Sequence, residues 1–431
     1  MIAWAIASLA VVRSAYAAEP LTPTGDTAST TTPPASAIEP NKDPTKGYAV
    51  SAYVQSQYET HQDSEDQLRQ GGALINRDRF LVRRGRAKVE REWDWASLMV
   101  EVDGNTTNGP AFQLWHAEPS ILYRGKNDAK MPPLVKATIG LFDTPFGFEL
   151  VESPRTRFFM ERSTASRAFW PAEPDVGARL SGAVGWFRYA FALVNGQPAG
   201  LSSFALQDPN GSKDLIARVG GVVEVRDKVD FQFGVSFLNG KGFHAGTSAT
   251  KNTLVWRDLN ENGIIDLGEV QPVAGIAATP SVNFDRWAVG ADLRLHFRTR
   301  VGWTTLFGEL VFASNLDRAL VVADPVLTGI DAREVGYVAG ITQEIGDYAV
   351  VGLRYDFYDP NADYLDRRAG QLIPASQRIR NVSPLVGLVL PKRARLLLEY
   401  DVQRNYFARD DRGVPVNLPS NTWTLRLQVE L

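Results

Sequence analysis

The chain has 431 residues, no cysteine and a formal net charge of −3, with 46 Lys and Arg against 49 Asp and Glu. The lack of cysteine excludes disulfides, thiolate nucleophiles and cysteine-ligated metals, and the lack of a basic excess argues against nucleic acid as a partner. Beyond the first dozen positions no apolar run approaches the roughly 20 residues of a membrane-spanning helix, so composition alone fits soluble domains or one large sheet.

The first residues have the pattern of an export signal. An apolar run at residues 2–12 is followed by Ala15, Tyr16 and Ala17, a small-x-small cleavage pattern. We expect residues 1–17 to be a signal peptide, with a buried N-terminal helix as the alternative. Residues 18–46 are rich in Pro, Thr, Ala and Ser, a composition that cannot bury a core, and are predicted to be a flexible periplasmic segment.

From residue 47 onwards, apolar and polar residues alternate in the manner of β-strands. The clearest example runs from Val229 to Phe237, where five apolar residues interleave with Asp, Gln, Gly and Ser. The alternation predicts sixteen strands, at residues 47–59, 77–90, 95–103, 111–124, 134–142, 175–184, 186–195, 214–225, 229–239, 284–297, 301–313, 333–345, 348–359, 381–390, 394–405 and 421–431.

The connections between these strands alternate between short and long. Short turns, such as 298–300 and 346–347, alternate along the chain with long segments, such as 143–174 and 240–283. The segment 240–283 is the longest. A membrane barrel has this asymmetry, and a closed sheet pairs every backbone group within hydrocarbon. We therefore predict an all-β fold over residues 47–431. It is a 16-stranded antiparallel transmembrane β-barrel with short periplasmic turns and long extracellular loops, in the outer membrane of a Gram-negative bacterium.

Three segments carry a family resemblance. They are residues 76–90 (NRDRFLVRRGRAKVE), residues 100–103 (VEVD) and residues 139–149 (IGLFDTPFGFE). They resemble the phosphate-selective porin family of the O/P type. The resemblance covers about residues 47–431, with its specific motifs concentrated in 76–196. It implies a homotrimeric diffusion channel whose third outer loop, here 143–174, folds inward and narrows the pore.

The sequence departs from that family in two places. Glu173 and Pro174 precede Asp175, where family members often carry Arg, and the chain ends in Leu431 where many outer-membrane proteins end in Phe. The second departure leaves an apolar outward-facing end and keeps the membrane assignment. The first leaves anion selectivity open.

Basic side chains on the lumen face and in the 143–174 loop define a candidate anion path, because guanidinium groups match the oxygens of phosphate. Its predicted members are Arg84, Arg86, Lys88, Arg155, Arg157, Arg162, Arg167 and Arg179. The alternative is a charge-paired loop, in which carboxylates such as Glu149, Glu152 and Glu161 neutralise the arginines and the pore is weakly selective. Arg83 falls on the outward face by simple alternation, which predicts a β-bulge or a strand end nearby.

A second motif lies in the longest loop. Residues 258–269 fit the pattern D-x-[DN]-x-[DN]-G-x5-E of a calcium-binding loop. The predicted ligands are side-chain oxygens and one backbone carbonyl, from Asp258, Asn260, Asn262, Ile264, Asp266 and Glu269. A polar Asn-Gly turn without metal is the alternative, and no cofactor is required for the predicted function.

These patterns together predict a porin through which small hydrophilic solutes, including anions such as phosphate, diffuse passively. Its partners would be outer-membrane lipid and two further copies of the chain. The chain is not expected to be an enzyme. A lipid-hydrolysing barrel needs a nucleophile beside a base, and none of the four histidines lies in a local Ser/His constellation. That alternative and a structural or adhesive surface role remain open at this point.

Overall fold

The computed structural model describes residues 47–61, 78–127, 131–196, 210–225, 228–363, 365–368, 371–374, 377–390, 393–406, 408–409, 415–417 and 420–431. The predicted signal peptide, 1–17, and the predicted periplasmic segment, 18–46, lie outside the described residues.

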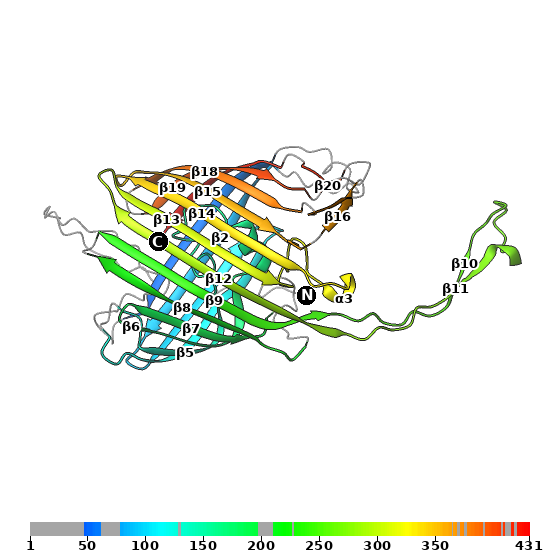
Figure 1. Ribbon diagram of the computed structural model, residues 1–431, viewed down its shortest axis with the longest axis horizontal. Coiled ribbons are helices and arrows are strands. Elements are labelled where there is room, and N and C mark those ends of the chain that lie inside the picture. The colour runs from blue at the N-terminus through cyan, green and yellow to red at the C-terminus, as the bar shows by residue number, and fades with distance from the viewer. Residues whose placement is uncertain are drawn as a thin grey trace, which may run out of the picture. The chain divides into compact units, whose positions relative to one another are not determined.

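Sixteen strands form one closed antiparallel barrel, in which each strand is hydrogen-bonded to the next (Figure 1). The strands are β1 (Ala49–His61), β2 (Arg79–Glu92), β3 (Ala96–Asn105), β4 (Ala111–Tyr123), β5 (Val135–Asp143), β6 (Pro174–Val184), β7 (Phe187–Val194), β8 (Asp214–Val225), β9 (Val229–His244), β12 (Val282–Arg298), β13 (Trp303–Ser314), β14 (Arg333–Ile345), β15 (Ala349–Asp359), β18 (Ile379–Leu390), β19 (Ala394–Arg404) and β22 (Thr422–Glu430). The last strand closes on the first, with Tyr53 opposite Glu430. The predicted fold class and strand number are confirmed, and β8 and β14 have the predicted bounds.

The two faces of the sheet differ in polarity, as the alternation requires. Along β12, Val289 and Leu293 point outward and are exposed, whereas Arg286 and Asp292 point into the barrel and are buried. Exposed apolar side chains recur on the outer face of other strands, for example Phe312 and Leu425. Such a surface suits hydrocarbon, where a closed barrel leaves no backbone group unpaired.

Two β-bulges shift the alternation in neighbouring parts of the wall. The pairing of β1 with β2 slips so that Gln55 lies opposite Arg84 and Ser56 opposite Val82, which leaves Arg83 as the extra residue. The bulge predicted near Arg83 is confirmed. A second bulge, which sequence reasoning missed, leaves Trp115 as the extra residue of β4. As a result Trp115 and His116, although consecutive, are both buried.

The segments beyond the barrel strands form short local elements. The β9–β12 ladder continues to the pair His244 and Val282, so the longest connection is 245–281. Its two arms run beyond the barrel rim and end in a hairpin (Figure 1). The small elements are α2 (Thr164–Phe169), β10 (Thr253–Trp256), the 3-10 turn η1 (Leu267–Glu269), β11 (Val270–Val273), α3 (Pro325–Thr328), β16 (Leu365–Arg368), β17 (Gln371–Pro374), β20 (Ala408–Arg409) and β21 (Pro415–Val416). Among the described residues, no helix is long and apolar enough to cross a membrane.

Candidate functional site

The segment between β5 and β6, residues 144–173, lies inside the barrel and is hydrogen-bonded to several parts of its wall. We call it the internal segment. Wall carboxylates accept its backbone N–H groups: Glu309 on β13 accepts from Phe148 at 2.8 Å, and Glu399 on β19 accepts from Met160 at 2.8 Å. On β15, Asp356 accepts from the Thr164 hydroxyl at 2.7 Å. These anchors lie on different strands, so the internal segment extends across the lumen.

Apolar side chains hold the same segment in place. One cluster contains four fully buried side chains of the internal segment together with apolar wall residues such as Ile216: they are Phe146, Leu150, Phe169 and Trp170. A second cluster joins Phe159 and Met160 to Val350, Leu385 and Leu397. Burial of this kind contributes about 1.5–3 kcal/mol for each large side chain. The lumen therefore contains a packed core and is narrower than the wall alone would make it.

A short helix ends the inward course of the internal segment. α2 begins after Ser163, whose hydroxyl accepts the N–H of Ser166 at 3.3 Å and satisfies a free helix-end donor. The Ser163 N–H donates in turn to the Glu149 carboxylate at 3.0 Å. These local bonds fix the direction in which Phe169 and Trp170 enter the apolar cluster.

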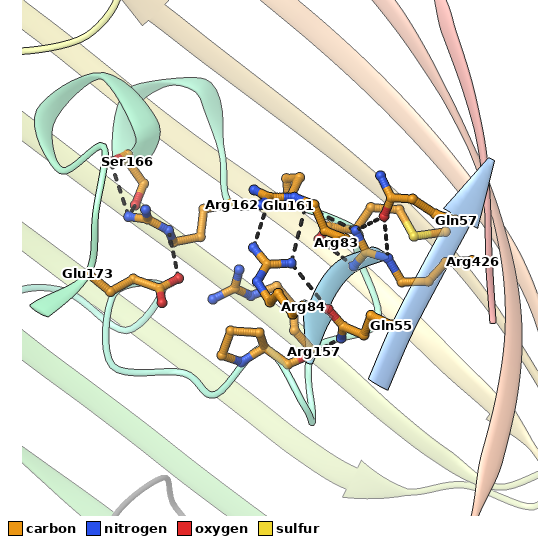
Figure 2. Close-up of polar contacts among 12 residues, drawn as sticks. Gln55, Gln57, Arg83, Arg84, Arg157, Glu161, Arg162, Ser166, Glu173 and Arg426 are labelled. Carbon is orange, nitrogen blue, oxygen red and sulfur yellow. Dashed lines mark hydrogen bonds and ion pairs between the residues drawn. The ribbon is translucent and has the colours of Figure 1, made fainter. Parts of the chain in front are cut away.

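One carboxylate of the internal segment lies among three guanidinium groups (Figure 2). Arg83 donates to Glu161 through Nε at 2.8 Å and Nη2 at 3.0 Å. Arg84 donates through Nη2 at 2.7 Å, and Arg426 donates through Nη2 at 3.0 Å. The β2 bulge is the reason that two consecutive arginines can reach the same carboxylate. We call Arg83, Arg84 and Arg426 the arginine cluster.

The charge of Glu161 is fixed by this environment. Burial alone would raise the pKa of its carboxyl group, but Arg83, Arg84 and Arg426 hold that pKa well below its usual range. Glu161 is therefore ionised at neutral pH.

A second charged group surrounds Arg86. Its guanidinium lies 3.3 Å from Asp103, 3.5 Å from Glu173 and 3.8 Å from Glu101, and it stacks over the Trp115 ring at 4.1 Å. Glu173 also pairs with Arg162 at 3.3 Å. Here carboxylates outnumber guanidinium groups, so no positive charge remains for a solute.

Most of the predicted anion path is paired in this way. Arg84 and Arg86 bond as described, and Arg162 also donates to the Trp170 carbonyl at 2.7 Å. The other members each lie beside a carboxylate: Lys88 is 3.0 Å from Glu90, Arg155 is 4.0 Å from Glu430, Arg157 is 3.4 Å from Glu152, and Arg179 pairs with Glu118. Arg167 is exposed on α2 and has no such partner among the described residues.

Two members of the arginine cluster, Arg83 and Arg426, lie outside the predicted anion path. Arg83 is absent because alternation places it on the outer face, although that anomaly is itself the signal of the bulge. Arg426 is a buried residue of β22, and its contact with Glu161 spans 265 positions in the chain. One sequence gives no signal for such a pairing.

A second loop also enters the barrel and packs on the internal segment. Leu316 is fully buried in the apolar cluster, and Arg318 donates to the Phe169 carbonyl at 2.9 Å. Asp317 accepts from the Tyr358 hydroxyl at 2.5 Å and from backbone N–H groups of its own loop. Nothing in the sequence distinguishes this loop, because residues 314–332 resemble any other long outer loop.

The predicted calcium loop is folded on itself. Asp258 accepts the N–H of Asn262 at 3.1 Å and that of Gly263 at 2.6 Å, and Glu269 accepts the N–H of Leu259 at 3.0 Å. Asp266 accepts from the Asn260 side chain at 3.0 Å, while Ile264 is exposed. Across the part of the chain that the structure describes, no three acidic or histidine side chains are grouped as a metal site. Calcium binding here stays a prediction from the sequence pattern.

That prediction can be tested on the whole protein. Calcium added to the purified chain should give a saturable heat signal in a calorimetric titration, because five oxygen-bearing side chains lie within one short loop. An Asp258→Ala variant should lose the signal, and an Asp285→Ala variant, changed at an exposed acid outside the loop, should keep it. No heat at millimolar calcium in the unaltered protein would reject the site.

The fold is similar to those of solved outer-membrane proteins. The outer-membrane channel DcaP of Acinetobacter baumannii has a TM-score of 0.53 at 10% identity, over 89% of this chain and 97% of that chain. An anion-selective porin from Comamonas acidovorans has a TM-score of 0.52 at 11% identity, over 89% and 98%. OprB of Pseudomonas putida has 0.50 at 12% identity, over 90% and 95%. The sequence matches no known family profile and no curated protein.

The TM-scores indicate a shared fold, and sequence identities this low support nothing beyond the fold. The closed 16-stranded barrel with its apolar outer face is an outer-membrane β-barrel, and its place is the outer membrane of a Gram-negative bacterium. The resemblance to phosphate-selective porins remains a prediction from the sequence motifs.

Proposed function

We propose that this protein is a porin, a channel through which small hydrophilic solutes cross the outer membrane by passive diffusion, and that it is not an enzyme. The observation that carries the proposal is the internal segment, bonded to Glu309, Asp356 and Glu399 of the wall. A segment held across a polar lumen narrows a water-filled passage, as diffusion channels require for selectivity. The likeness to an outer-membrane channel and to an anion-selective porin supports this choice.

We further propose a modest preference for anions such as phosphate. The arginine cluster supports a preference, since three guanidinium groups share the carboxylate of Glu161. The pairing of Arg86, Arg157, Arg162 and other members with carboxylates limits it. A near-balanced lumen leaves only a small field to attract one sign of ion.

The proposed partners are outer-membrane lipid around the apolar face and two further copies of the chain. The homotrimer rests on the sequence resemblance described above, and chemical cross-linking in membranes would detect it.

Reversal potentials test the proposed selectivity. The protein would be reconstituted in a planar bilayer between two concentrations of KCl, and then between two concentrations of potassium phosphate. We expect a small potential of the sign that favours anions. A strong cation preference would contradict the anion proposal while leaving the channel proposal intact, whereas a protein that conducts no ions would favour a structural or adhesive role.

A further inference from the structure

Glu161 differs from the other described carboxylates of the lumen in the number of guanidinium groups with which it forms ion pairs. It lies within ion-pair distance of all three members of the arginine cluster, at 2.8 Å from Arg83, 2.7 Å from Arg84 and 3.0 Å from Arg426. Arg83 and Arg84 both approach it with two nitrogens, the fork geometry that a guanidinium adopts on an oxyanion. The carboxylate thus occupies the position that an anionic solute would take in the cluster.

The other partners of the arginine cluster carry no charge. Arg84 donates to the Gln55 side chain at 3.2 Å, and Arg426 donates to the Gln57 side chain at 2.8 Å (Figure 2). Arg426 also donates to the Met160 carbonyl at 2.7 Å. Within the described residues, Glu161 is the one carboxylate paired with these arginines. Three positive charges against one negative charge leave the cluster with a net charge of +2.

Arg86 shows the opposite balance in the same lumen. It lies beside Asp103, Glu173 and Glu101, of which Glu173 is shared with Arg162 and Glu101 also contacts His116. Three carboxylates therefore surround two guanidinium groups there. Removing one acid from that group would leave others in place. Removing the charge of Glu161 would leave the arginine cluster with no directly paired carboxylate among the described residues, and only Glu173 and Glu399 would act on it from a longer range.

The arginine cluster is open to solutes on one side. The side chains of Arg83 and Glu161 keep 30% and 23% of their exposure, whereas Arg84 and Arg426 keep 7% and 3%. Arg84 and Arg426 are therefore buried in the wall, where Gln55 and Gln57 accept their hydrogen bonds. Arg83 and Glu161 face accessible space. A hydrated anion can reach Arg83 and compete with Glu161 for it.

We propose that Glu161 is the residue that sets the anion selectivity of the channel, acting as a built-in counter-anion that occupies the Arg83, Arg84 and Arg426 cluster and excludes solute oxyanions from it. This inference rests on the proposed channel function and assigns its selectivity to one side chain. With the carboxylate in place the cluster attracts anions weakly. Without its charge the cluster becomes a vacant oxyanion site of the kind that phosphate or another multivalent anion fills.

The test compares two substitutions that remove the same charge from the same segment. Glu161→Gln deletes the charge in the arginine cluster. Glu152→Gln deletes it near Arg157 and Arg294, at 3.4 Å and 3.6 Å. We expect Glu161→Gln to raise the chloride-to-potassium permeability ratio roughly threefold, the scale of one unit charge acting across a wet channel. Inorganic phosphate should also block the chloride current of Glu161→Gln more than that of the unaltered protein.

Glu152→Gln should shift the permeability ratio much less. Equal shifts in the two variants, or no shift in Glu161→Gln, would overturn the proposal. A protein that forms no channel at all would instead remove the proposed function, so the two failures are distinct.

A second pair keeps the inference testable if Glu161→Gln does not fold. Arg83→Gln removes the exposed member of the cluster, and Arg294→Gln removes a lumen arginine with 25% side-chain exposure and a single acidic partner. Arg83→Gln should lower the permeability ratio for anions more than Arg294→Gln does. Folding of each variant is read from its mobility on gels with and without heating, and equal effects in this pair would also contradict the proposal.

Discussion

Replacing Phe169 by alanine is expected to raise the mean conductance of the channel and to add large current fluctuations. Phe169 is fully buried where the internal segment, strand β15 and the second inward loop meet. Its ring packs edge to face on Trp170 and Tyr358, with ring centroids 5.7 Å and 5.5 Å apart. Its backbone carbonyl accepts a hydrogen bond from Arg318 of the second inward loop. Removing a buried phenyl group costs about 3–5 kcal/mol in transfer and cavity terms.

The loss should act on the internal segment and not on the barrel. The sixteen strands are closed by backbone hydrogen bonds that do not involve Phe169, and segments with fewer buried contacts open locally before the whole fold does. Single-channel recordings measure the effect. Phe112→Ala, which shortens an outward-facing ring that is 75% exposed, is the control and should behave like the unaltered protein. Recordings of Phe169→Ala that match those of Phe112→Ala would show that the internal segment does not limit the current.

Replacing Arg86 by methionine should strongly destabilise the protein. The guanidinium is almost fully buried against Asp103, Glu173 and Glu101. Its removal leaves the buried Asp103 without its counter-charge and leaves Glu173 with Arg162 alone. Breaking a buried ion pair on one side costs about 3–5 kcal/mol. Urea unfolding followed by tryptophan fluorescence in lipid or detergent measures the change, since the chain has ten tryptophans.

Lys88 is the matched control for this prediction. It lies on the same strand face two residues away, keeps 32% of its side-chain exposure and pairs with Glu90 at 3.0 Å. Lys88→Met should cost about 1 kcal/mol or less, as exposed pairs do. Adding Asp103→Asn to Arg86→Met should recover part of the loss, because it removes one uncompensated charge. Similar unfolding midpoints for Arg86→Met and Lys88→Met would contradict the account of this group.

The strands of this protein could be predicted closely because a barrel imposes one rule on every strand. Residues that face lipid must be apolar and residues that face the lumen are polar, so period-2 alternation marks each strand, as in β9 and β12. The prediction lost accuracy where neighbouring strands extend each other beyond the membrane. The ladder from Lys241 opposite Asp285 to His244 opposite Val282 continues without a clear apolar face.

The site was less accessible to sequence reasoning, for two physical reasons. Bulges break the alternation, so Arg83 was noticed as an anomaly, while Trp115 passed unnoticed within an otherwise regular strand. Ion pairs such as Arg426 with Glu161 join distant parts of the chain, and only the closed barrel brings them together. The nearly neutral composition nevertheless carried information, since most lumen arginines have a carboxylate beside them.

Single-channel conductance of the purified, refolded full-length chain in a planar lipid bilayer tests the central claim most directly. We predict discrete, stable current steps in symmetrical KCl, because a water-filled lumen narrowed by the internal segment conducts ions continuously once inserted. A membrane that contains correctly folded barrel, as judged by its heat-dependent gel mobility, and yet shows no steps above the baseline would contradict the assignment of this protein as a diffusion channel.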